Sequence, residues 1–159
     1  MGKYLEVVVD LRALDKLAKG LKGYRKMLAK ELQQALTRTL LDIEATAKER
    51  CPVDTGRLRA SITPEVVSAT EGYVGTNVAY AAAVEYGSRP HEIRPRKAKV
   101  LAWKDKKSGE QRFARKVNHP GTAAHPFLEP AYLEGRRAAQ KHFDAALERL
   151  EDQLEQALR

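Results

Sequence analysis

The chain has 159 residues, of which 43% are hydrophobic and 31% are charged, and no stretch approaches the ~20 apolar residues of a membrane span. This composition is typical of one globular domain, residues 1–159, made and folded in the cytoplasm, and it excludes extensive disorder and a membrane protein. The single cysteine, Cys51, excludes an internal disulfide.

The net charge of +8 is concentrated in one segment. Residues 88–120 contain eleven lysines and arginines against three acids, an excess equal to the net charge of the whole chain. A localised positive field favours a nucleic acid or an acidic protein as partner, with a solubilising loop as the alternative. The residues expected to face that partner or DNA are Arg89, Arg94, Arg96, Lys97, Lys99, Lys104, Lys106, Lys107, Arg112, Arg115 and Lys116.

The first elements predicted along the chain are a strand and two helices. Alternation over residues 4–11 predicts a strand, and an apolar face over residues 11–19 predicts a short helix interrupted at Gly20 and Gly23. A long helix is predicted from residue 24 to about residue 50, because Pro52 disfavours helical geometry before it. Its apolar stripe comprises Leu28, Leu32, Leu36, Leu40, Ile43 and Ala47.

Short elements are predicted between this helix and residue 87. They are a helical turn through Leu58 capped by Asp54 or Thr55, strands at 61–69 and 73–78 joined by a turn at 70–72, and a helix at 79–85 closed by Gly87. Pro64 indicates that the first of the two strands lies at a sheet edge or carries a bulge.

The basic segment is predicted to contain a hairpin, with strands at 100–104 and 111–117 around residues 106–109. In a hairpin the alternation of residue types would place apolar groups on one face and cations on the other. We interpret Trp103 and Phe113 as inward-facing core residues, with stacking on nucleic-acid bases as the alternative.

The last element predicted is a helix over residues 127–159, in which Gly135 is a potential breaker. A two-heptad apolar seam either packs in the core or pairs with a neighbouring subunit, and it comprises Phe143, Leu147, Leu150, Leu154 and Ala157. The fold expected is α+β, with long helices packed on one face of a small antiparallel sheet and a protruding basic hairpin. Residues 1–23 would supply the N-terminal strand and short helix of that single domain.

The sequence contains no recognisable catalytic constellation. Asp54, Thr55 and Gly56 match the triplet of aspartic proteases, which pair two carboxylates, but a turn with an unusual backbone angle at Gly56 explains the triplet without catalysis. The four histidines and Cys51 lack zinc-ligand spacing, and no serine has a nucleophile-elbow context. We expect no enzyme, no cofactor and no metal site.

Five segments in a fixed order carry a resemblance to a known family. They are CPVDTGRL at 51–58, VGTN at 74–77, YAAAVEYG at 80–87, PHEIRPRKA at 90–98, and HPGT at 119–122 followed by PFLEPA at 126–131. In these segments the chain resembles the phage tail components or neck proteins typified by gene product ten of the lambdoid phage Hong Kong ninety-seven. The resemblance covers about residues 25–150, and the family has no assigned catalytic residues.

The resemblance implies a structural virion protein of a long-tailed phage or prophage-derived particle, in the head–tail connector (neck) or completing the tail for head joining. It implies a homo-oligomeric ring of six or twelve copies at the head–tail junction, in contact with connector, stopper, tail-terminator or tail proteins. Non-specific contact with packaged DNA would be a further interaction, and no membrane would be involved. Loops 89–99 and 118–126 would dock neighbouring subunits or the next ring, and their interface residues would be Pro90, His91, His119, Pro120, Gly121, His125 and Pro126.

Two alternatives remain open beside this interpretation. A stand-alone cytoplasmic DNA-binding protein would use the basic residues 89–116 as its whole site. Tyr80, Glu85 and Tyr86 would help to fix the docking loops, or they are buried as ordinary core residues.

Overall fold

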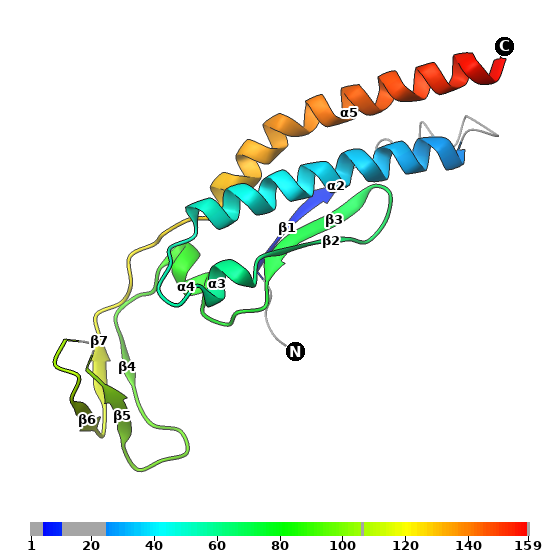
Figure 1. Ribbon diagram of the computed structural model, residues 1–159. Coiled ribbons are helices and arrows are strands. Elements are labelled where there is room, and N and C mark those ends of the chain that lie inside the picture. The colour runs from blue at the N-terminus through cyan, green and yellow to red at the C-terminus, as the bar shows by residue number, and fades with distance from the viewer. Residues whose placement is uncertain (1–4, 11–24, 106, 159) are drawn as a thin grey trace.

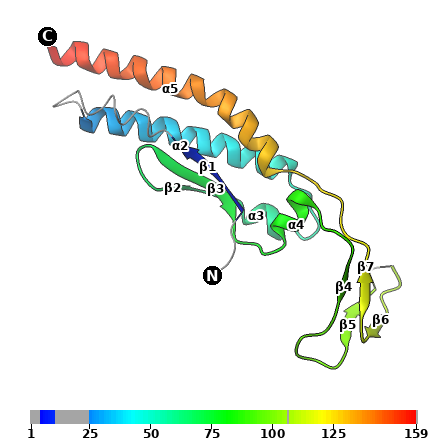
Figure 2. The same cartoon turned by 180° about the vertical axis from the view of Figure 1, so that it is seen from behind.

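The computed structural model describes residues 5–10, 25–105 and 107–158, and it has three layers (Figures 1 and 2). Helix α2 (Arg25–Arg50) lies between a three-stranded antiparallel sheet and helix α5 (Leu128–Leu158). Both long helices therefore lie on the same side of the sheet. The α+β fold with long helices on one face of a small antiparallel sheet is confirmed.

Helix α2 forms the centre of the core. All six residues of its predicted apolar stripe are buried, and four of them, Leu36, Leu40, Ile43 and Ala47, have no exposed surface. The helix ends at Arg50, immediately before the Cys51–Pro52 pair, as the proline requires. The repeat of leucines at steps of three and four was thus sufficient to predict both the length and the buried face of this helix.

The sheet has the order β1 (Leu5–Asp10), β3 (Glu71–Thr76), β2 (Thr63–Val66), with both pairings antiparallel. The predicted strands are confirmed, and Pro64 lies on the edge strand β2, where a residue without an N–H is tolerated. The predicted turn at 70–72 is wrong, because Glu71 and Gly72 belong to β3 and the turn precedes them. A Cβ at Gly72 would lie 2.5 Å from Leu40 Cδ1, so this glycine allows the sheet to approach α2 closely.

Helix α5 crosses α2 at Gly135, which is buried inside the helix and does not break it. A Cβ at this position would lie 2.1 Å from Ile43 Cγ1, so the helices approach more closely than any larger residue permits. The predicted seam packs in the core only in part: Phe143 and Leu150 are buried, but Leu147 is 41% exposed. Ala146 takes the core position instead, because a straight helix of 3.6 residues per turn packed on one neighbour buries only a narrow stripe. Leu154 packs partly buried against this core, and the side chain of Ala157 lies outside the described residues.

A polar contact joins the distal parts of the two long helices. Glu31 of α2 is buried and accepts hydrogen bonds from Arg149 Nε at 2.8 Å and Gln153 Nε2 at 3.1 Å, both from α5. The bond from Arg149 holds the pKa of the Glu31 carboxyl below its ordinary value, against the opposing effect of burial.

Two short helices connect the layers. Helix α3 (Arg57–Ala60) begins after Gly56, whose φ of 79° is left-handed, so Gly56 rather than Asp54 or Thr55 is its N-cap residue. Thr55 Oγ1 nevertheless accepts a hydrogen bond from the Arg57 N–H at 3.5 Å, at the start of this helix. The left-handed backbone at Gly56 turns the chain into the first turn of α3, which confirms the unusual backbone angle predicted at this glycine. Helix α4 (Ala81–Tyr86) ends at Gly87, the predicted C-cap. The predicted helix at 11–19 and the breaks at Gly20 and Gly23 lie outside the described residues.

The basic segment forms two small antiparallel ladders away from the helices (Figures 1 and 2). Strand β4 (His91–Ile93) pairs with β7 (Val117–His119), and β5 (Leu101–Lys104) pairs with β6 (Gln111–Ala114). The single strand predicted at 111–117 is therefore divided, since its last residue belongs to a different ladder. The predicted hairpin strand 100–104 corresponds to β5.

Candidate assembly surface

The basic segment extends from the three layers as an arm, residues 86–126, whose two ends meet at one place. Glu85, the residue just before the arm, is buried in α4. Its carboxylate accepts hydrogen bonds from the backbone N–H groups of Phe127 (2.8 Å), Leu128 (3.0 Å) and Glu129 (2.9 Å), at the start of α5. These N–H groups have no partner within the helix, and the positive end of the helix dipole attracts the carboxylate. Glu85 therefore fastens the two ends of the arm together. It is both buried and in contact with the loops, so the two alternatives stated for this residue hold at once.

The backbone continues this contact into the arm. His125 N donates to Val84 O at 2.7 Å, and Ser88 and Thr122 exchange two hydrogen bonds at 2.9 and 3.0 Å. Gly87 and Gly121 have positive φ, and a Cβ on either would lie within 2.6 Å of a backbone oxygen of the opposite segment of the arm. Only glycines allow the two backbone segments to approach this closely. The root of the arm is therefore a close-packed, hydrogen-bonded pair of segments.

The arm contributes nothing to the hydrophobic core. Among its described residues, which are all but Lys106, none is buried. Its aromatic residues are instead open to solvent: Tyr86 is 67%, Phe113 62% and Trp103 40% exposed. A two-stranded ladder is marginally stable in water, and exposed apolar groups together with such ladders are typical of a surface that a partner covers.

The interpretation of Trp103 and Phe113 as core residues is wrong, and so is the expected separation of apolar and cationic faces. Trp103 lies opposite Arg112 in the β5–β6 register, and Phe113 lies opposite Ala102, two residues from Lys104 on the same face. Each face of the hairpin thus presents one aromatic ring with one cation. The cause is that the ladder has no neighbouring layer against which a separate apolar face would pack.

Two of the three acids in the arm are occupied by cations of the arm itself. Arg94 and Lys116 both bond to the Glu92 carboxylate and hold its pKa below the ordinary value, with Lys116 Nζ at 3.0 Å. The N–H groups of Ser108 and Lys107 donate to Asp105 Oδ1 and lower the pKa of that carboxyl, and Arg112 Nε lies 3.4 Å from its Oδ2. Both acids therefore stay ionised, and they order the arm locally.

The other cations are available to a partner. In the described part of the chain no ion pair involves these exposed side chains: Arg89, Arg96, Lys97, Lys99, Lys104, Lys107 and Arg115. Lys106 lies outside the described residues. The structure thus places the predicted partner-facing cations along one projection rather than around one pocket.

The two loops predicted to dock neighbouring subunits lie beside each other. His91 of the first loop and His119 of the second are opposite residues of the β4–β7 ladder, and their rings stack with centroids 5.0 Å apart. Pro90, Pro120, His125 and Pro126 are exposed, and Gly121 is half-buried at the root. The sequence does not predict this pairing, because segments this far apart in the chain leave no local signal of their contact.

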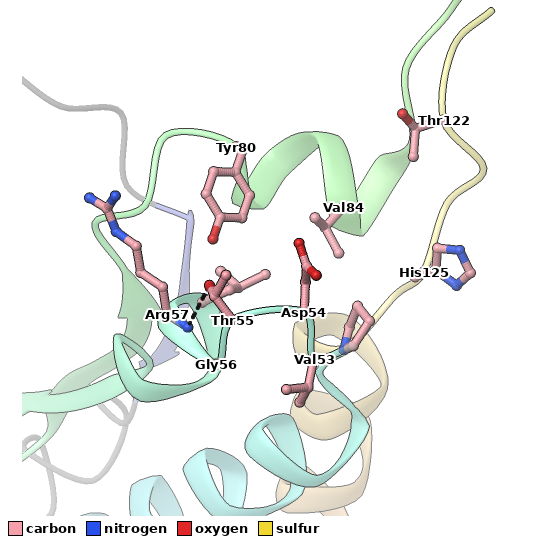
Figure 3. Close-up of a pocket in the computed structure, with 11 residues that line it drawn as sticks. Val53, Asp54, Thr55, Gly56, Arg57, Tyr80, Val84, Thr122 and His125 are labelled. Atoms are coloured by element: carbon pink, nitrogen blue, oxygen red, sulfur yellow. Dashed lines mark hydrogen bonds between the residues drawn. The ribbon is translucent and has the colours of Figure 1, made fainter. Parts of the chain in front are cut away.

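A shallow cavity of about 300 Å³ lies beside the root of the arm (Figure 3). Three of the segments singled out in the sequence meet in its wall: residues 52–58, Tyr80 with Val84, and Thr122 with His125. In Figure 3 the side chains of Asp54 and Thr55 face Val84 of α4 and Tyr80, the residue before that helix, across the opening. In the described part of the chain, no group of three or more His, Cys, Asp or Glu side chains is placed to hold a metal ion. We assign no reaction to this cavity.

Comparison with protein families identifies residues 15–87 as matching the family described as "Bacteriophage HK97-gp10, putative tail-component". This match confirms the family resemblance over residues 15–87, whereas the segments quoted at 90–98 and 119–131 lie outside the matched residues. A tail component works in the virion, in contact with other phage structural proteins. No curated protein and no solved structure matches the chain. None of the described helices is long and apolar enough to cross a membrane.

Proposed function

We propose that this protein, whose residues 15–87 belong to the HK97-gp10-like family of phage tail components, is a part of the head–tail connector or completes the tail for head joining. In this proposal residues 1–159 act as one domain, with the arm as its docking element. Six or twelve copies form a ring at the head–tail junction, because the symmetry of that junction calls for such a number. Connector, stopper, tail-terminator or tail proteins adjoin the ring.

The observation that carries the proposal is that none of the described residues of the arm is buried. An arm of this kind does not stabilise the fold of the protomer, and it exposes the rings of Trp103 and Phe113 beside cations. Burying such groups against a neighbour would stabilise both the arm and the assembly. The root, fixed by Glu85 and by the Ser88–Thr122 pair, holds the arm in one direction relative to the helices. A docking element needs this preorganisation, because ordering it only on contact would weaken binding.

Phage particles made with and without the protein provide the test. We expect heads and tails to remain unjoined without it, and we expect the labelled protein at the junction of complete particles in electron micrographs. A variant lacking residues 94–116 should fold but fail to enter particles. Complete, infectious particles without the protein, or its absence from purified particles, would overturn the proposal.

A second candidate, a stand-alone DNA-binding protein, is favoured by one observation. Trp103 and Phe113 are exposed beside Arg112 and Lys104, and an aromatic ring with a cation is a common platform for nucleic-acid bases. Titration with duplex and single-stranded DNA at several salt concentrations decides the matter. Tight binding that weakens steeply with salt, by a protein absent from particles, would establish this candidate in place of the first.

A further inference from the structure

The distal half of α5 carries a stripe of acids. The carboxylates of Asp144, Glu148, Glu151, Asp152 and Glu155 are exposed, and their spacing of three and four residues places them on one face of the helix. In the described part of the chain none of them forms an ion pair. The one cation among residues 144–156 is Arg149, which is bonded to Glu31. We call these five residues the acidic stripe.

An apolar residue borders the acidic stripe. Leu147 is 41% exposed, and on the helix surface it neighbours Asp144 three residues before it and Glu151 four residues after it. The acidic stripe therefore offers carboxylates beside an apolar side chain. The β5–β6 hairpin of the arm offers the complementary set, Lys104 and Arg112 beside Phe113 and Trp103.

The two surfaces lie at opposite ends of the molecule, as both views show (Figures 1 and 2). The arm leaves from the start of α5, whereas at 1.5 Å per residue the acidic stripe lies about 24 to 40 Å farther along that helix. The arm also points away from the distal half of α5. An arm can therefore meet an acidic stripe only on another molecule.

We propose that the arm of one copy docks on the acidic stripe of α5 in a second copy. The inference deepens the proposed function, on which it rests, by naming the surfaces that join neighbouring copies. The contact joins two different surfaces of the same chain, so it repeats from copy to copy, and it closes into a ring if the rotation between copies allows. Seating the hairpin there would bring its cations to the unpaired carboxylates and cover Leu147 together with the exposed aromatic rings.

A charge-exchange experiment tests this contact. The arm variant Lys104→Glu/Lys107→Glu changes two exposed cations of the hairpin, and it and the stripe variant Glu148→Lys/Glu151→Lys each replace attraction by repulsion. The variant with all four changes restores opposite charges and has the net charge of the unchanged protein. Arg38→Glu/Arg59→Glu is the control for the arm variant, because both arginines are exposed, lie outside the arm and form no ion pair in the described part of the chain.

Sedimentation over a range of protein concentrations, at low and high salt, measures self-association. At low salt each double variant should associate about tenfold more weakly than the unchanged protein and the control, and the fourfold variant should recover most of that loss. High salt should reduce the differences, because the Debye length shortens.

Equal association of all variants, or no recovery in the fourfold variant, would overturn the inference. If the unchanged protein stays monomeric, the same variants are compared for incorporation into particles, and equal incorporation also overturns it. Unchanged self-association together with loss of DNA retention in the arm variant alone would assign the arm to DNA. The proposed function fails separately, when the unchanged protein is absent from particles.

Discussion

Replacing Glu85 should destabilise the protein more than replacing any exposed acid, because three backbone N–H groups depend on its carboxylate. In Glu85→Gln the amide oxygen can still accept from Phe127 and Leu128, which share Oε2, but the amide nitrogen then faces the N–H of Glu129. The hydrogen bond from Glu129 is lost, and the hydrogen bonds from Phe127 and Leu128 are then made to a neutral acceptor instead of a charged one. A hydrogen bond to a charged group contributes about 1.5 to 3 kcal/mol, so we expect a loss of about 2 kcal/mol in the free energy of unfolding.

Glu85→Ala leaves all three N–H groups without this acceptor, two of them, those of Phe127 and Leu128, in a buried place, and we expect a loss of about 3 to 5 kcal/mol. Glu129→Gln is the matched control, because Glu129 is exposed in the first turn of the same helix. Urea unfolding gives the free energies, and amide hydrogen exchange at Phe127, Leu128 and Glu129 shows whether the loss is local. If Glu85→Gln were as stable as the unchanged protein and these amides kept their protection, the assignment of Glu85 as the fastening of the arm would be wrong.

Other predictions concern the arm and the contact between the long helices. Replacing residues 94–116 by Asn-Gly, which joins β4 to β7 through a two-residue turn, should change the free energy of unfolding by only about 0.5 kcal/mol in urea, because no described residue of that segment is buried. A large loss would show that the arm supports the core. Glu31→Gln should cost about 1 to 2 kcal/mol at neutral pH. Since the folded pKa of Glu31 is lowered, its contribution is present above the unfolded value near 4.5 and disappears as the pH falls through the folded pKa, so unfolding curves of the two proteins should converge in acid. Gly135→Ala should cost about 1 to 3 kcal/mol by collision with Ile43, and Ile43→Ala in the same chain should recover part of that loss, a coupling that a double-mutant cycle measures.

Local pattern was enough to predict the elements of the fold but not their contacts. The apolar stripe of α2 follows from periodicity alone. For Pro64 the missing N–H group predicts either an edge strand or a bulge, and the structure has the edge strand. Gly72 was taken for a turn residue, because the residue that excludes a side chain there, Leu40, is distant in the sequence. Whether Leu147 packs in the core or faces a neighbouring subunit is not predictable, because the sequence carries the spacing of the seam but not the width of the surface that covers it.

The candidate site shows the same division. The concentration of positive charge at 88–120 was visible in the sequence, and it proved to mark one projecting arm. The fastening of that arm by Glu85 was not predictable, since the residues it joins lie more than forty positions apart in the chain. Exposure of Trp103 and Phe113 also escaped prediction, because alternation in a hairpin is the same whether or not another layer covers it.

The separation of the arm from the buried residues also has an evolutionary consequence. Under the proposed docking role, selection for the right neighbour acts on exposed residues of the arm. Selection for a stable protomer acts instead on the stripe of α2, on Gly72 and Gly135, and on the root glycines Gly87 and Gly121. Changes in the arm beyond its root are therefore expected to leave the fold intact. Its length is nearly as free, because doubling a loop adds only about 0.6 kcal/mol of closure entropy. Exchange of the arm between two proteins of this kind is therefore expected to exchange the neighbours they select.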